Sequence, residues 1–196
     1  MPEHVCPPWM SFTLTNVFRR MSQDPGRILG GFIRPGDVVL DIGCGPGFFA
    51  VPMARMVGAT GSVVAVDIHS DMLERTRKRA VRAGVSGRIR LHLAEKARLG
   101  LDVRADFALA FWMAHEVPDP GRLFAEIRDA LKPEGCLLLV EPRMHVAEDA
   151  FAGLVGAAED AGFVREGEER IRLSRAVVLR CSAVAGPRSA PVECDR

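Results

Sequence analysis

Blocks of consecutive apolar residues, separated by more polar stretches, form the main pattern of this chain. Four of them predict strands, at residues 38–40, 62–66, 107–112 and 136–140. Within each block apolar residues are nearly continuous and do not alternate with polar ones, which is typical of strands buried on both faces. The pattern therefore predicts a parallel sheet with helices packed on both sides.

Segments with helical composition lie between and after these strands, at residues 48–57, 70–82, 123–131 and 146–161. We expect Ser70 to cap the second helix at its N-terminus, because a serine hydroxyl can accept a hydrogen bond from the first free amides. Residues 132–135, Lys-Pro-Glu-Gly, are expected to end the third helix. Strand and helix thus alternate along most of the chain.

Three weaker strands are predicted at residues 88–93, 162–165 and 176–179, and the last two are expected to form an antiparallel hairpin. The order of elements predicts an α/β fold with a doubly wound, Rossmann-like open sheet of seven mostly parallel strands. In such a sheet ligands bind at the carboxyl ends of the strands.

A length of 196 residues fits one domain. We assign residues 25–181 to this domain, residues 1–24 to an N-terminal arm or lid over the active site, and residues 182–196 to a flexible tail. His4, Cys6 and Trp9 are the residues of the arm that could reach the site.

Charge and cysteine content narrow the functional classes. Lys and Arg number 26 against 25 Asp and Glu, so the net charge of +1 gives no general reason to expect nucleic acid or an anionic membrane as a partner. Five scattered cysteines without a C-x-x-C pair predict reduced thiols and no metal site. We see neither a signal peptide nor an apolar run of about 18 residues that could span a membrane, so a cytoplasmic location is expected.

The loop at residues 41–47, Asp-Ile-Gly-Cys-Gly-Pro-Gly, joins the first strand to a helix. Glycines there let a ligand approach the backbone closely. Position 48 is Phe48, so the G-x-G-x-x-G fingerprint of dinucleotide sites is absent, and a nicotinamide oxidoreductase is disfavoured. Asp41 before the first glycine would repel a pyrophosphate and favours a ligand with an ammonium or sulfonium charge, while Asp67, about 20 residues past the loop, suits ribose hydroxyls.

These features resemble the class I S-adenosylmethionine-dependent methyltransferases. The likeness covers roughly residues 33–179 and includes the runs at residues 39–47, 66–68, 72–73, 105–107 and 131–135. It implies S-adenosyl-L-methionine as cofactor, with S-adenosyl-L-homocysteine as product. It also implies that Asp41 lies near the methionine ammonium, that Gly43 and Gly45 pass beneath the methionine and ribose, and that Asp67 binds the ribose. The further cofactor-site residues that it implies are Cys44, Ile68, Met72, Glu95, Lys96 and Phe111.

Two of these positions need comment. Where the family usually carries Gly-Asp-Ala, this chain has Ala94-Glu95-Lys96, so Glu95 is the expected partner of the adenine amino group. Cys44 is better explained as a small filler of the loop than as a nucleophile. Phe111 and Trp112 resemble the positions that face the cofactor and the cleft for methyl transfer.

His115, with Glu116 beside it, is the candidate general base, because an imidazole titrates near neutral pH. Glu141, Arg143 and His145 follow the next strand and are expected at the same rim. The tetrad of nucleic-acid amino-methyltransferases is missing at residues 111–114, so we expect a small-molecule acceptor, as in the similar quinone-biosynthesis and arsenite groups. A metalloid or thiol methyltransferase and an inactive cofactor-binding module stay open as alternatives, and oligomeric state is left undetermined.

Overall fold

A computed structural model describes residues 23–182 of the protein. The expectations for an arm and a tail therefore lie almost wholly outside the described residues. The helices are α2 (Pro25–Leu29), α3 (Ala50–Met56), α4 (Ser70–Arg82), α5 (Pro120–Ala130) and α6 (Glu148–Asp160), with short 3₁₀ turns η1 (Ser86–Arg88) and η2 (Ala114–Glu116). The strands are β1 (Val38–Ile42), β2 (Ser62–Asp67), β3 (Ile89–Leu93), β4 (Ala105–Phe111), β5 (Leu131–Pro142), β6 (Phe163–Glu168) and β7 (Ser174–Cys181).

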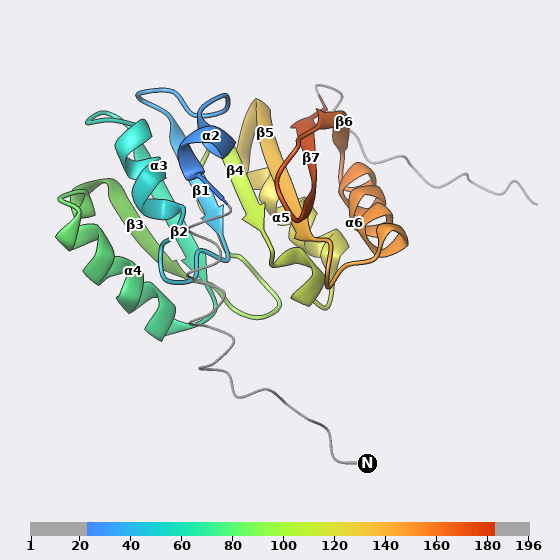
Figure 1. Ribbon diagram of the computed structural model, residues 1–196, viewed down its shortest axis with the longest axis horizontal. Helices are drawn as coiled ribbons and strands as arrows, with labels where there is room; N and C mark the ends of the chain where they lie inside the picture. Colours follow the sequence, from blue (N-terminus) through green and yellow to red (C-terminus); the bar gives the residue numbers. More distant parts are fainter. Residues whose placement is uncertain (1–22, 183–196) are drawn as a thin grey trace, which may run out of the picture.

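Seven strands form one sheet in the order β3-β2-β1-β4-β5-β7-β6 (Figure 1). Strands β1 to β5 run parallel to one another, and β7 runs antiparallel to both β5 and β6. The doubly wound sheet with a C-terminal antiparallel hairpin is confirmed. The strand order reverses between β1 and β4, which is where an open sheet of this kind leaves a crevice for a ligand.

Each face of the sheet carries its own apolar core. In β1 the side chain of Val39 packs with residues of α2, α3 and α4, whereas Leu40 packs with residues of α5 and α6. The same division continues through β2, β4 and β5. Both kinds of position are buried, and this explains why the strand sequences are continuous in apolar residues.

The prediction that Ser70 caps α4 is wrong. The helix has Ser70 as its first residue, His69 occupies the cap position, and no side chain there makes a capping bond. Instead, the Asp67 carboxylate accepts the amide hydrogen of His69 at 2.9 Å. The acid at the end of β2 thus holds the residue that precedes α4, and the first amides of the helix have no side-chain cap.

Helix α5 begins three residues earlier than predicted, because Asp119 caps it by accepting from the amide of Arg122 at 2.9 Å. It ends at Ala130, and residues 132–135 then form an irregular, bulged part of β5. Leu131 lies opposite Ala105, while Cys136 lies opposite Phe107, so one strand advances five residues where its neighbour advances two. The Lys-Pro-Glu-Gly run therefore lies within β5 as an irregularity and does not separate the helix from the strand.

Across residues 23–182, none of the helices combines the length and apolar character that crossing a bilayer requires.

Candidate active site

A cavity of about 690 Å³ lies at the carboxyl ends of β1, β2 and β4, beside the point where the strand order reverses. Eight of the residues predicted for the site line it: Gly43, Gly45, Asp67, Ile68, Met72, Lys96, Phe111 and Glu116. Its volume is within the range of roughly 300–1,000 Å³ typical of small-ligand sites. The sheet therefore brings together most of the residues that the sequence marked.

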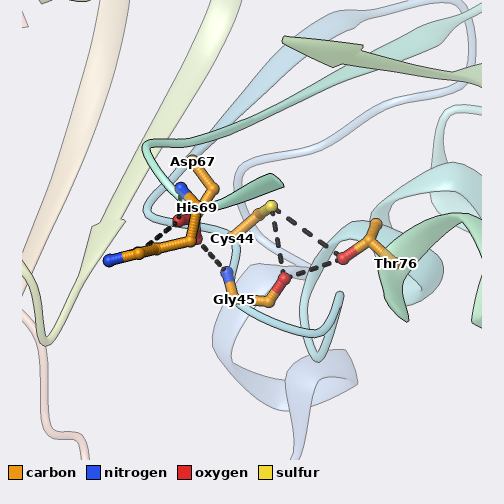
Figure 2. Close-up of polar contacts among 5 residues, drawn as sticks. All are labelled: Cys44, Gly45, Asp67, His69 and Thr76. Atoms are coloured by element: carbon orange, nitrogen blue, oxygen red, sulfur yellow. Dashed lines mark hydrogen bonds and ion pairs between the residues drawn. The ribbon is translucent and has the colours of Figure 1, made fainter. Parts of the chain in front are cut away.

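The glycine loop is fixed in place by hydrogen bonds to β2 and α4, and Figure 2 shows those to Asp67 and Thr76. The amide of Gly45 donates to Asp67 Oδ2 at 2.9 Å, and the hydroxyl of Thr76, on α4, donates to the Gly45 carbonyl at 2.8 Å. One residue earlier, the Cys44 amide donates to the Val66 carbonyl at 2.9 Å. The loop is thus held against β2 and α4 and presents its open side to the cavity.

All three glycines in the loop have left-handed backbone angles, and the surroundings of Gly43 and Gly45 differ. Gly43 has φ +70°, and a Cβ built there would lie 2.9 Å from Cγ of Met113. Gly45 has φ +52°, and a Cβ there would meet nothing within 4 Å. The open space at Gly45 belongs to the cavity that it lines, so a ligand can lie directly on its backbone.

Asp67 links the loop to the start of α4. Its Oδ1 accepts from the His69 amide at 2.9 Å and lies 3.2 Å from the His69 Nδ1, while its Oδ2 accepts from Gly45. The residue is 8% exposed and lines the cavity. Because each carboxylate oxygen accepts more than one hydrogen bond, Asp67 can hold the loop and still bind hydroxyl groups of a ligand.

Three other predicted cofactor residues are not part of the cavity lining. Asp41 is 2% exposed within β1, beneath the loop. Cys44 is buried, and its Sγ contacts Thr76 Oγ1 (Figure 2) at a distance of 3.9 Å. Burial raises the pKa of its thiol. Glu95 is exposed and pairs through its backbone with Arg98. Cys44 thus fills space under the loop, and any contact of Asp41 or Glu95 with a cofactor stays a prediction.

The opposite wall of the cavity is mostly apolar and follows β4. It consists of Phe111, Trp112, Met113, Val117 and Pro118, with Glu116 as the charged member. Trp112 has φ +58°, a left-handed angle unusual for a bulky residue, and is held by bonds from its amide to Val140 and from its indole Nε1 to Ser174 Oγ at 3.0 Å. Such strain persists only where neighbouring contacts enforce it, and it is common at ligand sites.

His115 and Glu141 form a close pair at this end of the sheet. Nδ1 of His115 lies 2.5 Å from Oε2 of Glu141, and Glu141 Oε1 accepts from the amides of Ala114 and His115 at 2.8 and 3.2 Å. The Glu141 side chain has no exposed surface, and burial raises its pKa while the His115 ring opposes that rise. On its other side, Nε2 of His115 lies 3.9 Å from Oε1 of Glu116.

The sequence placed Glu141 at the rim but did not pair it with His115. The adjacency of β4 and β5 in the sheet brings the two residues together. Arg143, expected at the same rim, donates from Nε to the Ser174 carbonyl at 2.9 Å, and His145 is exposed. Neither lines the cavity.

The residues present fit S-adenosylmethionine. Asp67 offers a carboxylate for the ribose, Gly45 leaves open space over its backbone, and Ile68 and Met72 offer apolar surface for a base. Within residues 23–182 no cluster of three or more His, Cys, Asp or Glu side chains could hold a metal ion.

Comparisons with known proteins agree with this site. The family described as "Methyltransferase domain" matches residues 39–135. The ubiquinone/menaquinone biosynthesis C-methyltransferase UbiE of Haemophilus ducreyi is 32% identical over 133 residues, which are 67% of this chain and 49% of that protein. An uncharacterized 37.1 kDa protein in transposon TN4556 of Streptomyces fradiae is 34% identical over 110 residues, 56% of this chain and 31% of that one. The chain thus spans about half the length, or less, of these curated relatives.

The fold has a counterpart among solved structures. A SAM-dependent methyltransferase from Aquifex aeolicus superimposes with a TM-score of 0.77 and 24% sequence identity, over 90% of this chain and 99% of that one. Its likeness concerns the fold, and the family match at residues 39–135 includes the glycine loop and β4. The chain belongs to the class I S-adenosylmethionine-dependent methyltransferases, whose cofactor is S-adenosylmethionine.

Proposed function

We propose that the protein transfers the methyl group of S-adenosylmethionine to a small, largely apolar acceptor. The observation that carries this proposal is the composition of the one cavity at the switch point of the sheet. Its β1–β2 side holds the glycine loop and Asp67, and its β4 side holds the apolar wall of Phe111, Trp112 and Met113. Cofactor and acceptor would therefore meet inside a single cavity.

On the cofactor side, Asp67 would bind the ribose hydroxyls and Gly45 would pass beneath the ligand. Asp41, buried under the loop, would supply negative charge near the methionine ammonium. The bound cofactor supplies a methyl group on a positively charged sulfur, so the leaving group is already activated. The protein then has mainly to orient the acceptor and exclude water, and orientation alone can accelerate such a reaction by several powers of ten.

On the acceptor side, the apolar wall favours a molecule with a ring or hydrocarbon surface. Trp112 is held by its bonds to Val140 and Ser174, so its indole forms a fixed surface. An acceptor that loses a proton needs a base. Glu116 is the titratable group that lines this wall, and His115, which is not itself part of the lining, lies behind it with Nε2 3.9 Å from Glu116 Oε1. The UbiE relatives are named as C-methyltransferases of ubiquinone and menaquinone biosynthesis, which favours methylation at carbon on an acceptor of similar chemistry.

A metalloid methyltransferase that holds its acceptor through cysteine thiols finds no support in residues 23–182. The three cysteines described there, Cys44, Cys136 and Cys181, are buried, none lines the cavity, and burial raises the pKa of each thiol. A buried protonated thiol is a poor nucleophile and a poor ligand.

The test is an assay with S-adenosylmethionine labelled in its methyl group and three separate acceptor pools: soluble phenols and hydroquinones, RNA, and protein extract. We expect label in the phenol or hydroquinone fraction, together with S-adenosylhomocysteine. The Asp67→Ala variant should lose this signal. Label only in RNA or protein would contradict the small-molecule proposal, and bound cofactor without any transfer would point to the inactive binding module.

A further inference from the structure

The contact between Glu141 and His115 has the arrangement of a carboxylate that orients a base. Glu141 has no exposed side-chain surface, and its two oxygens have separate tasks. Oε1 accepts the amide hydrogens of Ala114 and His115, and Oε2 lies 2.5 Å from Nδ1 of the His115 ring. The carboxylate is thus held by the backbone on one side and meets the imidazole with the other.

We propose that Glu141 is a positioning residue that keeps the hydrogen of neutral His115 on Nδ1 and leaves Nε2 free to take the acceptor's proton. This inference rests on the proposed function. The charged groups that face the ring are Glu141, from β5, and Glu116, from η2. Because an ionised carboxylate only accepts hydrogen bonds, Nδ1 must carry a hydrogen at so short a distance.

The tautomer decides which ring nitrogen is basic. With Nδ1 occupied, the lone pair is on Nε2, which lies 3.9 Å from the Glu116 carboxylate on the cavity wall. As the methyl group bonds to the acceptor, the acceptor's proton would move to Nε2 and form an N–H bond there. The ring would then be positively charged, and the Glu141 carboxylate would balance that charge.

A Glu141→Gln substitution separates this role from simple packing. The amide oxygen must still accept from the backbone amides of Ala114 and His115, so the amide NH₂ turns to the ring. Nδ1 then has to accept a hydrogen bond, and the hydrogen of the neutral ring moves to Nε2. Shape and buried volume hardly change, but the basic nitrogen is lost from the side of the ring that faces Glu116.

Nitrogen-15 NMR of the histidine-labelled protein reads the tautomer directly, without cofactor or acceptor. His115 signals are assigned with a His115→Gln variant, at a pH high enough that the ring is neutral. We expect the wild-type protein to show hydrogen on Nδ1 and Glu141→Gln to show it on Nε2. The matched control is Glu148→Gln, the same change at an exposed glutamate 3.8 Å from Arg175, which should leave the His115 signals unchanged.

The wild-type spectrum alone can overturn the proposal: hydrogen on Nε2 of neutral His115 would do so even if Glu141→Gln did not fold. The proposal would also be overturned if the wild type and a folded Glu141→Gln variant showed the same His115 tautomer. That result is expected of a carboxylate that only caps η2. With a phenol or hydroquinone that the wild type methylates, Glu141→Gln should lose about 10²- to 10⁴-fold in kcat, the usual contribution of a general base, with an unchanged Kd for S-adenosylmethionine. Failure of the wild type to bind S-adenosylmethionine would instead refute the proposed function and leave the tautomer result standing.

Discussion

Substitution of the loop glycines by alanine distinguishes backbone strain from loss of space for the ligand. Three glycines with similar left-handed angles are available: Gly43 (φ +70°), Gly45 (φ +52°) and Gly84 (φ +69°). A Cβ at Gly43 would lie 2.9 Å from the Met113 side chain. At Gly45 and Gly84 it would meet no protein atom within 4 Å. Only Gly45 combines open space with a place in the cavity lining, whereas Gly84 follows α4.

The magnitudes follow from these surroundings. A left-handed angle at a residue with a Cβ costs about 1–2 kcal/mol, so Gly45→Ala and Gly84→Ala should lower the free energy of unfolding by that amount. Gly43→Ala adds a clash with Met113 and should lose roughly 1–3 kcal/mol more. For binding, the methyl group at Gly45 would intrude on the ligand and cost about 1–3 kcal/mol, or roughly a 5- to 150-fold higher Kd for S-adenosylmethionine.

Urea unfolding and isothermal titration calorimetry measure the two quantities separately. Gly84→Ala is the matched control: it should be as destabilised as Gly45→Ala and bind S-adenosylmethionine with the wild-type Kd. If Gly45→Ala also bound with the wild-type Kd, the ligand would not lie over Gly45, and our reading of the cavity would be refuted.

Two further predictions concern the support of the site and its pH dependence. Thr76→Val removes the hydroxyl that donates to the Gly45 carbonyl at 2.8 Å and should lower the free energy of unfolding in urea by about 1 kcal/mol; an unchanged value would mean that this bond does not hold the loop. Burial raises the pKa of Cys136 from 9.0 to about 11, so the folded state keeps a proton that the unfolded state releases. The free energy of unfolding should therefore fall as pH rises from 9 toward 11, and Cys136→Ala should reduce this slope; equal slopes in both proteins would contradict the assigned shift. The chain has no tyrosine, which removes one competing titration from this range.

The sheet and its two layers of helices were predictable because burial on both faces gives each strand a continuous apolar sequence. Strands β1, β2 and β4 were found within a few residues of their observed ends for this reason. The start of α4 was harder to predict, because Asp67 accepts from the amide of His69, the residue before the helix, and Ser70 is already inside the helix. A capping preference describes one residue and takes no account of an acid at the end of the preceding strand.

The orientation of side chains in the loop and the pairing of distant residues were harder to predict. Cys44 lies between two left-handed glycines, where neither a helical nor a strand period tells which way a side chain points. Glu141 and His115 are 26 residues apart, and only the sheet order, which makes β4 and β5 neighbours, brings them together. A doubly wound topology predicts which strands are neighbours. The acids and bases at the carboxyl ends of neighbouring strands are therefore a signal that could have suggested the pair of Glu141 and His115.

The central claim is that the cavity at the switch point binds S-adenosylmethionine, and thermal unfolding with added ligand tests it most directly. A ligand at 100 times its Kd adds about 2.7 kcal/mol to the free energy of unfolding, which raises the Tm of a domain of this size by roughly 5–11 °C. We predict such a rise with S-adenosylmethionine and with S-adenosylhomocysteine, and none with NAD. A rise with NAD alone, or no rise with either sulfur compound at saturating concentration, would contradict the account.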